Sequence, residues 1–433
     1  MGKKRIIILG AGLAGLSAAY HLQKQGKECL VFEKESEVGG LCRSKNVGGF
    51  TFDICGHLLH FKHHYAFSLV RDLLGDNLAE HKKSAWIYSH GAYTRYPFQA
   101  NLYGLPHSVV KECLLGFIQK PKNGLFKKGR NNNFLHWIND SFGGGVAKHF
   151  MVPYNTKFWT VSPSSLTCEW LDGIIPVPSL GQVIEGSVDE SKRQFGYNAR
   201  FWYPRNGGIN QLPDALARRI KGINTNCEVV QIDTGKKEIK TRSGTSEKFD
   251  YLISTIPLPE LGHMIKGLTG NTAQVFKKLR FNSVFNLNLG IKERENLDKH
   301  WVYFPQREIP FFRAGFFHNF SSYIAPAGRG SMYIETSYSK ESPLRGNQLV
   351  PRIKQGLRKT GALNDNANIL QEDINDIRYA YPIYDRNYKT AREDIFKYLN
   401  LYNIIPCGRY GSWRYMSMED VIIDGKNIGE LFL

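Results

Sequence analysis

The chain has 433 residues, too many for one ordinary core, and its 42% hydrophobic content is enough to fill two or three domains. Lys and Arg exceed Asp and Glu by 18, a surplus that favours anionic partners such as nucleic acid, acidic lipid or phosphorylated small molecules without choosing between them. Seven cysteines without a CxxC pair argue against a disulfide scaffold and favour a reducing, cytoplasmic compartment.

The first predicted elements form a nucleotide site. "RIIIL" has the character of a buried parallel strand, and the following "GAGLAG" sets Gly10, Gly12 and Gly15 at the fingerprint spacing. Glycines there permit a tight turn and let a pyrophosphate approach the helix N-terminus, where free amides and the dipole favour anions.

A helix and a second strand complete this unit. "LSAAYHLQKQG" predicts an amphipathic helix that ends at Gly26, and "CLVF" predicts the next strand. Glu33 follows that strand, 18 residues after Gly15, where a dinucleotide-binding fold carries the carboxylate for a ribose hydroxyl. Strand, helix, strand and acid in register predict a dinucleotide-binding domain.

The next segment indicates which dinucleotide binds. "EKESEVGGLCRS" contains Gly39, Gly40 and Arg43, and this pattern resembles the second glycine motif of the FAD-binding amine-oxidase and glutathione-reductase-like superfamily. FAD is therefore the expected cofactor.

Two distant stretches extend that resemblance. "CEVVQID" (227–233), which contains Val229, is similar, together with the hairpin "KKEIKTRSG" and with "YLISTIP" (251–257), to the superfamily's second, adenine-side βββ unit. The C-terminal "NIIPCGRYGSWRYMSMEDVIIDG" resembles the closing strand and helix under the flavin. The resemblance implies that Gly408, Arg409 and Met418 contact the flavin and its pyrophosphate.

Further blocks carry a narrower resemblance. "RYPFQANLYGLP", "FMVPYNTKFWTVSPSSLTCEWL", "YNARFWYPRNGG", "WVYFPQREIPFFRAGFFHNF", "YAYPIY" and "GRYGSWRY" occur in the order found in the UDP-galactopyranose mutase family, in its longer, eukaryotic-type branch. The match covers essentially the whole chain. It implies an isomerase that acts on a UDP-sugar.

In that family the segment after Pro153 holds uracil. Carried over by position, the residues expected to line the uridine pocket are Tyr96, Phe98, Gln99, Tyr154, Asn155 and Trp159. Uracil offers a flat face for aromatic stacking and an imide edge for an amide side chain. Taken singly, each of these could be a core aromatic or a capping residue; the set of six favours a binding site.

The same carry-over continues toward the phosphates and the sugar. Arg313 is expected to hold the diphosphate, a task suited to a planar, permanently charged fork. His57 is expected on a mobile loop beside the isoalloxazine. The residues expected around the diphosphate and the sugar hydroxyls are Asn198, Tyr303, Tyr381 and Tyr415.

The chain also departs from the family pattern. Where the family has a second diphosphate-binding arginine this chain has Ile174, and a tyrosine near the clamp is Phe320. The loss of one charge-assisted contact weakens binding by about 1.5–3 kcal/mol unless Lys83 or Arg95 substitutes. The sugar could then differ from galactose, or the mutase chemistry could be altered or lost.

The resemblance implies an unusual use of flavin. Flavin N5 of reduced FAD attacks the anomeric carbon, forms a covalent sugar adduct and displaces UDP; the opened sugar then recloses as a furanose. There is no net redox change, so the flavin needs reduction once, by NADPH or NADH. A galactofuranose product would feed the biosynthesis of a cell-surface glycan or of a secondary metabolite.

Some features of the sequence also permit other functions and partners. An FAD-dependent oxidoreductase of the amine-oxidase or protoporphyrinogen-oxidase type shares the flavin domain, but the uridine blocks have no role there. A nucleic-acid-binding protein is permitted by the charge alone, since no basic run resembles a binding arm. The histidine-rich "CGHLLHFKHH" lacks a second ligand cluster, so no metal is expected. No eighteen-residue apolar run predicts a membrane span, and a homo-oligomer is compatible with the sequence.

The expected architecture is α/β: an FAD-binding Rossmann-like domain with an inserted helical domain and an antiparallel β-sheet domain. "SVVKECLLGFI" and "LHWINDSFGGGVAKHFM" have helical spacing, whereas "SVFNLNLGI" and "GSMYIETSY" alternate as strands do. The expected boundaries are 1–82, 205–275 and 392–433 for the FAD domain, 100–180 for the helical domain, and 83–99, 181–204 and 276–391 for the sheet domain.

Overall fold

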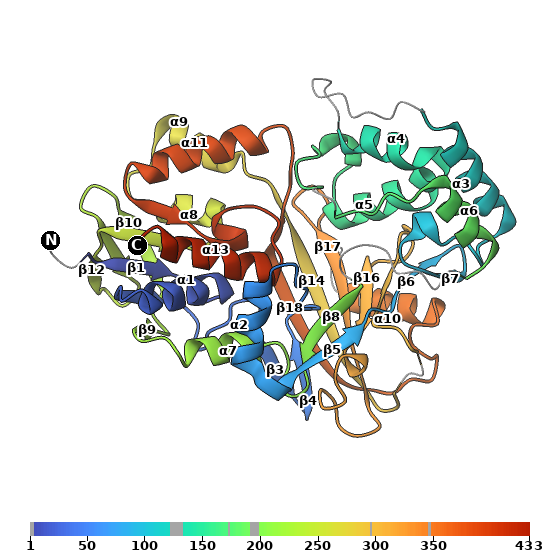
Figure 1. Cartoon of the computed structure of the whole chain (residues 1–433), viewed down its shortest axis with the longest axis horizontal. Helices are drawn as coiled ribbons and strands as arrows, with labels where there is room; N and C mark the ends of the chain where they lie inside the picture. The colour runs from blue at the N-terminus through green and yellow to red at the C-terminus, as the bar shows by residue number, and fades with distance from the viewer. Residues whose placement is uncertain (1–3, 122–132, 172–173, 191–198, 295–296, 345–347) are drawn as a thin grey trace.

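A computed structural model describes residues 4–121, 133–171, 174–190, 199–294, 297–344 and 348–433 of the chain. Figure 1 shows two lobes joined by long strands. The lobe that contains both termini is built on a parallel sheet, the other is helical, and a large mixed sheet lies between them. The α/β fold class expected from the sequence is confirmed.

The parallel sheet of the terminal lobe has the strand order β19-β13-β1-β2-β9. Its strands are rich in Ile, Val and Leu and mostly buried, as expected for a parallel sheet covered on both faces. Its bounds are β1 Ile6–Leu9, β2 Cys29–Phe32, β9 Ile223–Asn224, β13 Tyr251–Ser254 and β19 Ile404–Pro406.

Helices α1 (Leu13–Lys24) and α13 (Met418–Glu430) pack tightly against each other beside this sheet. Gly425 permits their close approach, because a Cβ there would lie 2.5 Å from Ser17. The first and last segments of the chain are therefore locked together around the nucleotide motif. The other helices of this lobe are α2 His64–Leu74, α7 Gln211–Ala217, α8 Leu258–Met264, α9 Gly270–Lys277, α11 Tyr388–Asn400 and the short α12 Gly408–Gly411.

A three-stranded sheet forms the expected βββ unit, with one correction. Its strands are β10 Val229–Asp233, β11 Glu238–Thr241 and β12 Ser246–Lys248. The segment "YLISTIP" is not its third strand: as β13 it pairs in parallel with β1. Its residues 252–254 are fully apolar or small and buried, which suits the centre of a parallel sheet better than an edge hairpin.

The large sheet between the lobes has the order β18-β14-β17-β16-β15-β6-β7. Neighbours are antiparallel except for β15 and β6. The bounds are β6 Ala85–Ser89, β7 Ala92–Arg95, β14 Phe281–Ile291, β15 Trp301–Tyr303, β16 Arg313–Phe316, β17 Gly330–Tyr338 and β18 Ile369–Pro382. Two small sheets flank it: β3 Ser44–Val47 with β4 Phe50–Asp53, and β5 Leu78–Lys82 with β8 Arg200–Pro204.

Alternation along β14 gives the large sheet two different faces. Leu287 and Leu289 pack in the cluster of buried side chains that includes Leu357 of α10 (Leu349–Lys359). The residues in between are asparagines, and Asn282 donates from Nδ2 to the carbonyl of Phe158 at 2.6 Å. The polar face of β14 therefore contacts the helical lobe at Asn282, while Asn288 donates to the carbonyl of Asp53 in β4 at 3.0 Å.

The helical lobe consists of α3 His107–Gln119, α4 Phe134–Val146, α5 Val152–Trp159 and α6 Leu180–Val188. The continuous helix expected over 135–151 breaks at Gly143, whose φ is 77°, and continues through a π-helical turn, Ala147–Met151. Gly143 also faces α3 closely, since a Cβ there would lie 1.9 Å from the carbonyl oxygen of Gly116. Residues 180–188 form a helix that contacts α3; the domain boundaries themselves stay a prediction.

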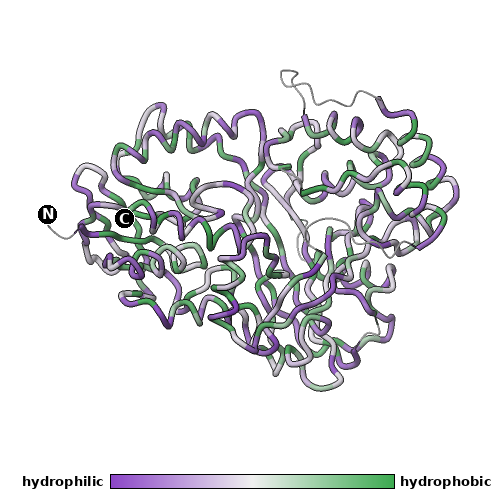
Figure 2. The backbone as a smooth tube through the Cα atoms, in the orientation of Figure 1, coloured by the Kyte–Doolittle hydropathy of each residue, from purple (hydrophilic) through white to green (hydrophobic). Residues whose placement is uncertain are grey.

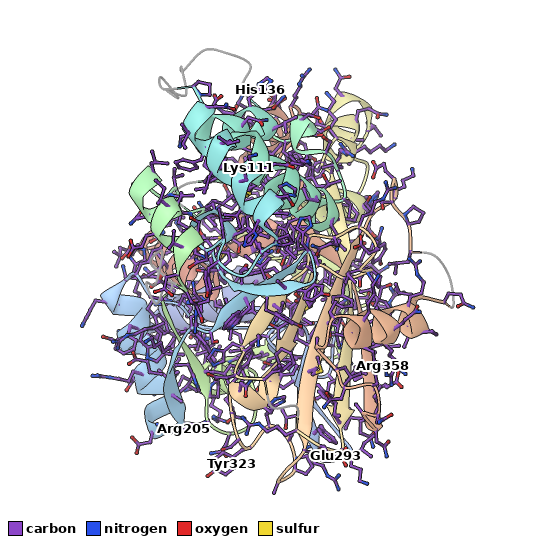
Figure 3. All side chains as sticks on the ribbon, turned by 90° about the vertical axis from the view of Figure 1, so that its right-hand side faces the viewer. Lys111, His136, Arg205, Glu293, Tyr323 and Arg358 are labelled. Atoms are coloured by element: carbon purple, nitrogen blue, oxygen red, sulfur yellow. The ribbon has the colours of Figure 1, made fainter. Side chains whose placement is uncertain are left out.

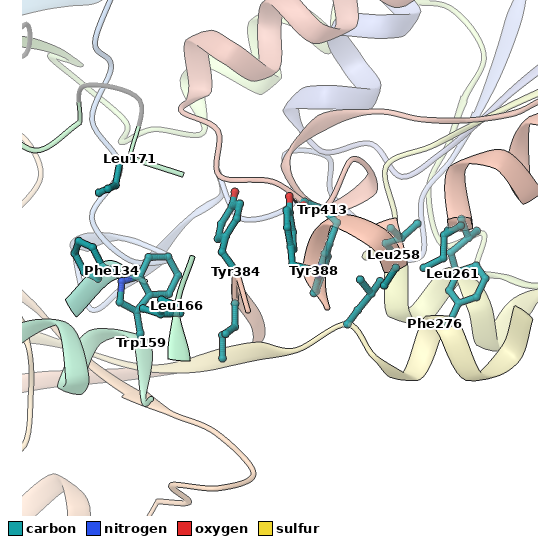
Figure 4. Packing of buried hydrophobic residues seen from close by; sticks show 14 of the residues in the cluster. Phe134, Trp159, Leu166, Leu171, Leu258, Leu261, Phe276, Tyr384, Tyr388 and Trp413 are labelled. Carbon is teal, nitrogen blue, oxygen red and sulfur yellow. Dashed lines mark hydrogen bonds between the residues drawn. The ribbon is translucent and has the colours of Figure 1, made fainter. Parts of the chain in front are cut away.

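One buried cluster links the two lobes. Figure 4 shows it running from Phe134 and Trp159 through Tyr384 and Tyr388 to Phe276 of α9. In Figure 2 most helices show both hydrophilic and hydrophobic stretches, as expected for amphipathic helices that cover a core. None of the helices in the described ranges is long and apolar enough to cross a bilayer.

Candidate active site

The glycine fingerprint forms a tight cradle at the carboxyl end of β1. Gly10 has φ 94°, and a Cβ at Gly15 would lie 2.0 Å from the carbonyl oxygen of Gly10, so no larger residue fits there. α1 starts after Gly12 without a side-chain cap, which leaves its first amides directed toward a ligand.

The neighbouring motif closes the cradle. Gly39 pairs with Gly12 and donates to the carbonyl of Ala11 at 2.8 Å. Gly40 is in close contact as well, because a Cβ on it would lie 3.2 Å from the Cα of Gly12. Arg43 donates from Nε to the carbonyl of Gly40 at 2.9 Å and holds this turn in place.

Glu33 lies at the end of β2 beside the cradle, where the sequence predicted a ribose-binding carboxylate. Its side chain is buried and accepts hydrogen bonds from the backbone of Ala11 at 2.7 Å and Glu35 at 3.0 Å. The glycine backbone offers N–H donors for a pyrophosphate, and the buried carboxylate offers an acceptor for a ribose hydroxyl. A dinucleotide needs both. The cradle thus fits a dinucleotide, as FAD is.

The C-terminal residues lie against the same cradle. Gly408 has φ 74°, a Cβ on it would lie 2.3 Å from that of Ala14, and its N–H donates to Asp424 at 2.6 Å. Met418 is the first residue of α13, after a capping box made by Ser417. Val229 begins β10. Whether these residues contact a flavin stays a prediction.

Aromatic side chains from segments far apart in the sequence lie together beside the large sheet, around the ends of β15 and β18. The ring of Tyr303 lies 5.4 Å from that of Tyr96 and 5.5 Å from that of Tyr154, between centroids. Tyr381 stacks on Tyr415 at 6.3 Å. Phe158 joins the two pairs, 6.1 Å from Tyr154 and 4.5 Å from Tyr381.

Arg409 connects this aromatic cluster to the cradle. Its guanidinium lies 4.6 Å from the centre of the Tyr381 ring and 4.9 Å from that of Tyr415, and it donates to the carbonyl of Ala380 at 3.1 Å. A cation at this junction can stabilise negative charge on either a flavin or a phosphate.

The residues predicted for uridine form one contiguous group in the helical lobe. Phe98 is fully buried and stacks on Phe150 at 5.0 Å. Asn155 donates from Nδ2 to the carbonyl of Met151 at 2.8 Å, and Gln99 donates to the carbonyl of Pro176 at 2.7 Å. Each amide thus donates its NH2 group to a backbone carbonyl, so its oxygen is the atom that could accept a hydrogen bond from a ligand.

Several buried polar atoms around the cluster have no hydrogen-bond partner within the described residues. They are Gln99 Oε1, Trp159 Nε1, His57 Nδ1 and Arg409 Nε. Buried polar groups are normally paired. Similar unpartnered atoms occur elsewhere in the described residues, but these four belong to residues predicted for the substrate or the flavin, and each could bond to a polar ligand.

Arg313 is bound to a partner that the sequence reasoning missed. Its Nε donates to the carboxylate of Glu335, which is 2% exposed, and Tyr333 lies 5.9 Å from the guanidinium. Burial alone would lower the pKa of Arg313, but the carboxylate of Glu335 keeps that pKa well above its usual value. The sequence does show a charged residue, Glu335, within the apolar stretch "SMYIET". Its partner Arg313 is identified only by the strand register of the fold.

His57 is neutral at physiological pH, because burial lowers its pKa to about 4. It lies among the same charges, since Glu335 raises the pKa of His57 and Arg409 lowers it. A neutral imidazole can donate one hydrogen bond and accept another, and it carries no positive charge that would repel the guanidinium of Arg313.

The two cations considered as substitutes for the missing arginine are placed differently. Arg95 donates to Glu190 at 2.7 Å, lies over Trp86 and lines a separate cavity of about 160 Å³. Lys83 lies 5.1 Å from the centre of the Tyr96 ring, at the aromatic cluster. Of the two, Lys83 is the one positioned to contribute.

The two positions that depart from the family pattern are occupied by apolar side chains. Ile174 is half-buried, with its N–H bonded to the carbonyl of Leu171. Phe320 is buried in apolar packing with Phe201 and Tyr203. Asn198 lies outside the described residues. Within them, no group of three His, Cys, Asp or Glu side chains is arranged to hold a metal ion.

The model of the flavin-containing amine oxidoreductase family matches residues 13–351 of this sequence. The chain belongs to that family. The predicted superfamily is therefore confirmed, and the family supports FAD as the cofactor.

Among the similar proteins are an amino-acid oxidase and a carotenoid desaturase. The L-amino-acid oxidase of Crotalus adamanteus is 26% identical over 257 residues, 56% of this chain and 48% of its own. The 1-hydroxycarotenoid 3,4-desaturase of a Flavobacterium strain is 24% identical, over 78% of this chain and 73% of its own. The chain thus spans about half the length of the oxidase it matches.

A solved structure of reduced UDP-galactopyranose mutase superposes on the whole molecule. It has a TM-score of 0.93 and 28% sequence identity, and the match covers 100% of this chain and 94% of the other. The close match extends through the helical lobe and the large sheet as well as the flavin fold.

Proposed function

We propose that this protein is a flavin-dependent mutase that interconverts the pyranose and furanose forms of a UDP-hexose, with UDP-galactose as the leading substrate. We place it in the eukaryotic-type branch of its relatives. The observation that carries the proposal is that buried polar atoms of Gln99 and Trp159 have no hydrogen-bond partner within the described residues, with Trp159 next to an aromatic cluster that contains Tyr381 and lies near Arg313. The full-length similarity to a mutase structure supports it.

The chain's own residues would divide the work. Tyr154 would offer its ring to a nucleobase, with the buried rings of Phe98 and Trp159 forming the wall of the site, and Gln99 would offer an amide oxygen to the nucleobase N–H. Arg313, fixed by Glu335, and Lys83 would support the diphosphate, both as it leaves and as it returns.

The sugar would lie between Tyr381, Tyr415 and the cofactor. Reduced FAD, bound at the cradle and reduced by NADPH or NADH, would supply the nucleophile for the anomeric carbon. The tyrosine rings would orient the sugar and exclude water, so that the reactive carbon meets the cofactor rather than solvent.

The test is a reaction that needs reduced cofactor but consumes none. The purified holoenzyme is reduced with dithionite under anaerobic conditions and given UDP-galactofuranose, and the products are separated by chromatography. We expect UDP-galactopyranose from the reduced enzyme and none from the oxidised enzyme. No conversion, combined with unchanged flavin absorbance on addition of UDP, would contradict the proposal.

A second candidate is an FAD-dependent oxidoreductase. The observation that favours it is the similarity to L-amino-acid oxidases and to a carotenoid desaturase. Such an enzyme would reduce its own flavin when given an amine or an unsaturated lipid and would release peroxide in air. Flavin bleaching by an amino-acid panel, without any response to UDP, would favour this candidate.

A further inference from the structure

The terminal lobe contains a cavity of about 450 Å³ where α8 and α9 meet the start of β14 and the last residues of β18. We name it the α8–α9 cavity. None of the residues that line it belongs to the cradle or to the group proposed for the UDP-sugar. Figure 1 shows α8 and α9 in the lobe that contains both termini, whereas Figure 3 looks onto the opposite end of the molecule. Cavities of this size hold small organic molecules.

The inner part of the α8–α9 cavity is apolar. Ile265, Phe276 and Leu279 line it, and all three side chains are buried. The rings of Phe281 and Tyr379 also line it, and their centroids are 4.5 Å apart. Aromatic rings beside an apolar floor favour a ligand with a flat, apolar body.

Basic side chains line the same cavity where it meets solvent. His263, Lys277 and Arg378 belong to its lining and are exposed. The segment 257–281 carries four Lys or Arg residues and one carboxylate, in a chain whose net charge is +18. The local charge therefore favours a ligand with a negative group.

The single carboxylate of that segment does not offset the basic charge at the cavity. Glu260 accepts a hydrogen bond from the hydroxyl of Tyr379 at 2.8 Å and lies 3.7 Å from the guanidinium of Arg378. Lys277, by contrast, forms no ion pair with any residue in the described ranges. Its ammonium group is thus available to an anionic ligand.

An irregularity in β18 brings two lining side chains to this place. The partners of Ile377 and Tyr381 on β14 are only two residues apart, so β18 carries extra residues between them. Arg378 and Tyr379 are among these extra residues, and both line the cavity. Bulges of this kind redirect side chains and are frequent beside functional sites. The strand geometry and the charge therefore point to the same place.

We propose that the α8–α9 cavity binds a small organic anion with an aromatic body, either an aryl acid or a nucleoside monophosphate. The flat part of the ligand would lie against Phe281 and Tyr379, and its anionic group would meet Lys277 and Arg378. The proposal does not depend on the reaction proposed above.

The test is calorimetric titration of the flavin-loaded full-length chain with naphthyl phosphate, in the presence of saturating UDP so that this probe cannot occupy the proposed substrate site. We expect saturable binding of one equivalent per chain, with a Kd between about ten micromolar and one millimolar. Ala273→Trp places an indole in the lining of the cavity and should weaken binding by about ten-fold or more. Gln274→Trp is the matched control, because Gln274 is the next residue of α9, is exposed and does not line the cavity.

Charge reversal tests the anionic end of the ligand. Lys277→Glu should weaken binding by about ten-fold or more, because a charge-assisted contact is replaced by repulsion. Lys278→Glu makes the same change next to the cavity but outside its lining, and Lys111→Glu makes it on α3 in the other lobe, where Figure 3 labels that residue. Salt screens exposed charges outside the site, so both controls should bind within about two-fold of the wild type.

Competition identifies the class of ligand. Displacement of naphthyl phosphate by AMP would support a nucleotide, and displacement by naphthoate but not by AMP would support an aryl acid. Flavin absorbance and melting temperature verify that every variant folds. The proposal would be overturned if neither probe binds saturably with UDP present, or if Ala273→Trp and Lys277→Glu bind as the wild type does. An equal loss in Lys278→Glu would also overturn it, since the attraction would then be a general effect of charge.

Discussion

At the dinucleotide cradle glycines allow neighbouring segments to approach closely, whereas the aromatic cluster is built from contacts between large side chains. The cradle depends on Gly10, Gly15 and Gly408, which leave no room for a Cβ. The cluster depends on rings from the residue after β7 and from α5, β15 and β18, and on one buried ion pair. A position with no room for a Cβ requires glycine, so the cradle is recognisable in the sequence and indicates the broad family. Aromatic side chains can replace one another in a packed cluster, so the residues that would select the substrate are harder to recognise.

Two glycines of the dinucleotide cradle, Gly15 and Gly12, provide its strictest test. Gly15→Ala places a methyl group 2.0 Å from the carbonyl oxygen of Gly10, so the turn must move; we expect a loss of stability of roughly 1–3 kcal/mol or more, together with loss of the flavin. Gly12→Ala makes an ordinary contact, 3.9 Å from Gly40. It should keep the stability of the apoprotein and lose only flavin affinity.

Urea unfolding and the ratio of flavin to protein absorbance separate these effects. If Gly12→Ala binds flavin as well as the wild type, the amides at the start of α1 are not the pyrophosphate site. If Gly15→Ala retains both stability and flavin, the tight approach at the cradle is not needed.

The sequence predicted the two ends unequally for the same physical reason. The strand, turn and helix of the cradle are local, so spacing alone located Gly10, Gly12, Gly15 and Glu33. "YLISTIP" was assigned to the wrong sheet, because a short apolar strand carries no sign of its partner. Glu335 was missed because its partner lies 22 residues away across a strand register that only the fold defines.

The side-chain end has its largest expected effect at the buried ion pair. Arg313→Met leaves the carboxylate of Glu335 buried without its cation, so we expect a loss of about 3–5 kcal/mol in the free energy of unfolding. Arg313→Met combined with Glu335→Leu should regain most of that stability without regaining affinity for UDP. Urea denaturation measures the first quantity and titration calorimetry the second. A double variant as unstable as the single one would contradict the coupling.

A smaller effect is expected in the uridine group. Trp159→Phe removes an indole N–H that has no partner within the described residues, and loss of one such hydrogen bond to ligand costs about 0.5–1.5 kcal/mol, up to roughly ten-fold in the Kd for UDP. Trp137→Phe changes a tryptophan of α4 that stacks on Phe134, outside the uridine group, and should leave the Kd unchanged. Equal effects of the two substitutions would move the nucleobase away from Trp159.

A pH titration tests Lys83. Burial lowers the pKa of Lys83 to about 8, so its ammonium group is present below that pH and is lost above it. Affinity for UDP, an anion, should therefore fall as pH rises through about 8, and Lys83→Met should remove this step and weaken binding at pH 7 by several-fold. Calorimetric titrations from pH 6.5 to 9.5 measure both. A pH profile that is the same in Lys83→Met assigns the step to another group.

The smallest effect is expected at Arg95, and this variant decides how the missing arginine is compensated. Arg95 and Lys83 are both cations near Tyr96, but Arg95 is already paired with Glu190 at a half-exposed surface, where a salt bridge contributes about 0–1 kcal/mol. Arg95→Met should therefore change neither the Kd for UDP nor its pH dependence and should reduce stability only slightly. If Arg95→Met weakens UDP binding while Lys83→Met does not, the diphosphate is approached from the side of Trp86. The chain would then hold it differently from a mutase clamp at Arg313, because a cation committed to Glu190 can serve a phosphate only by leaving that carboxylate.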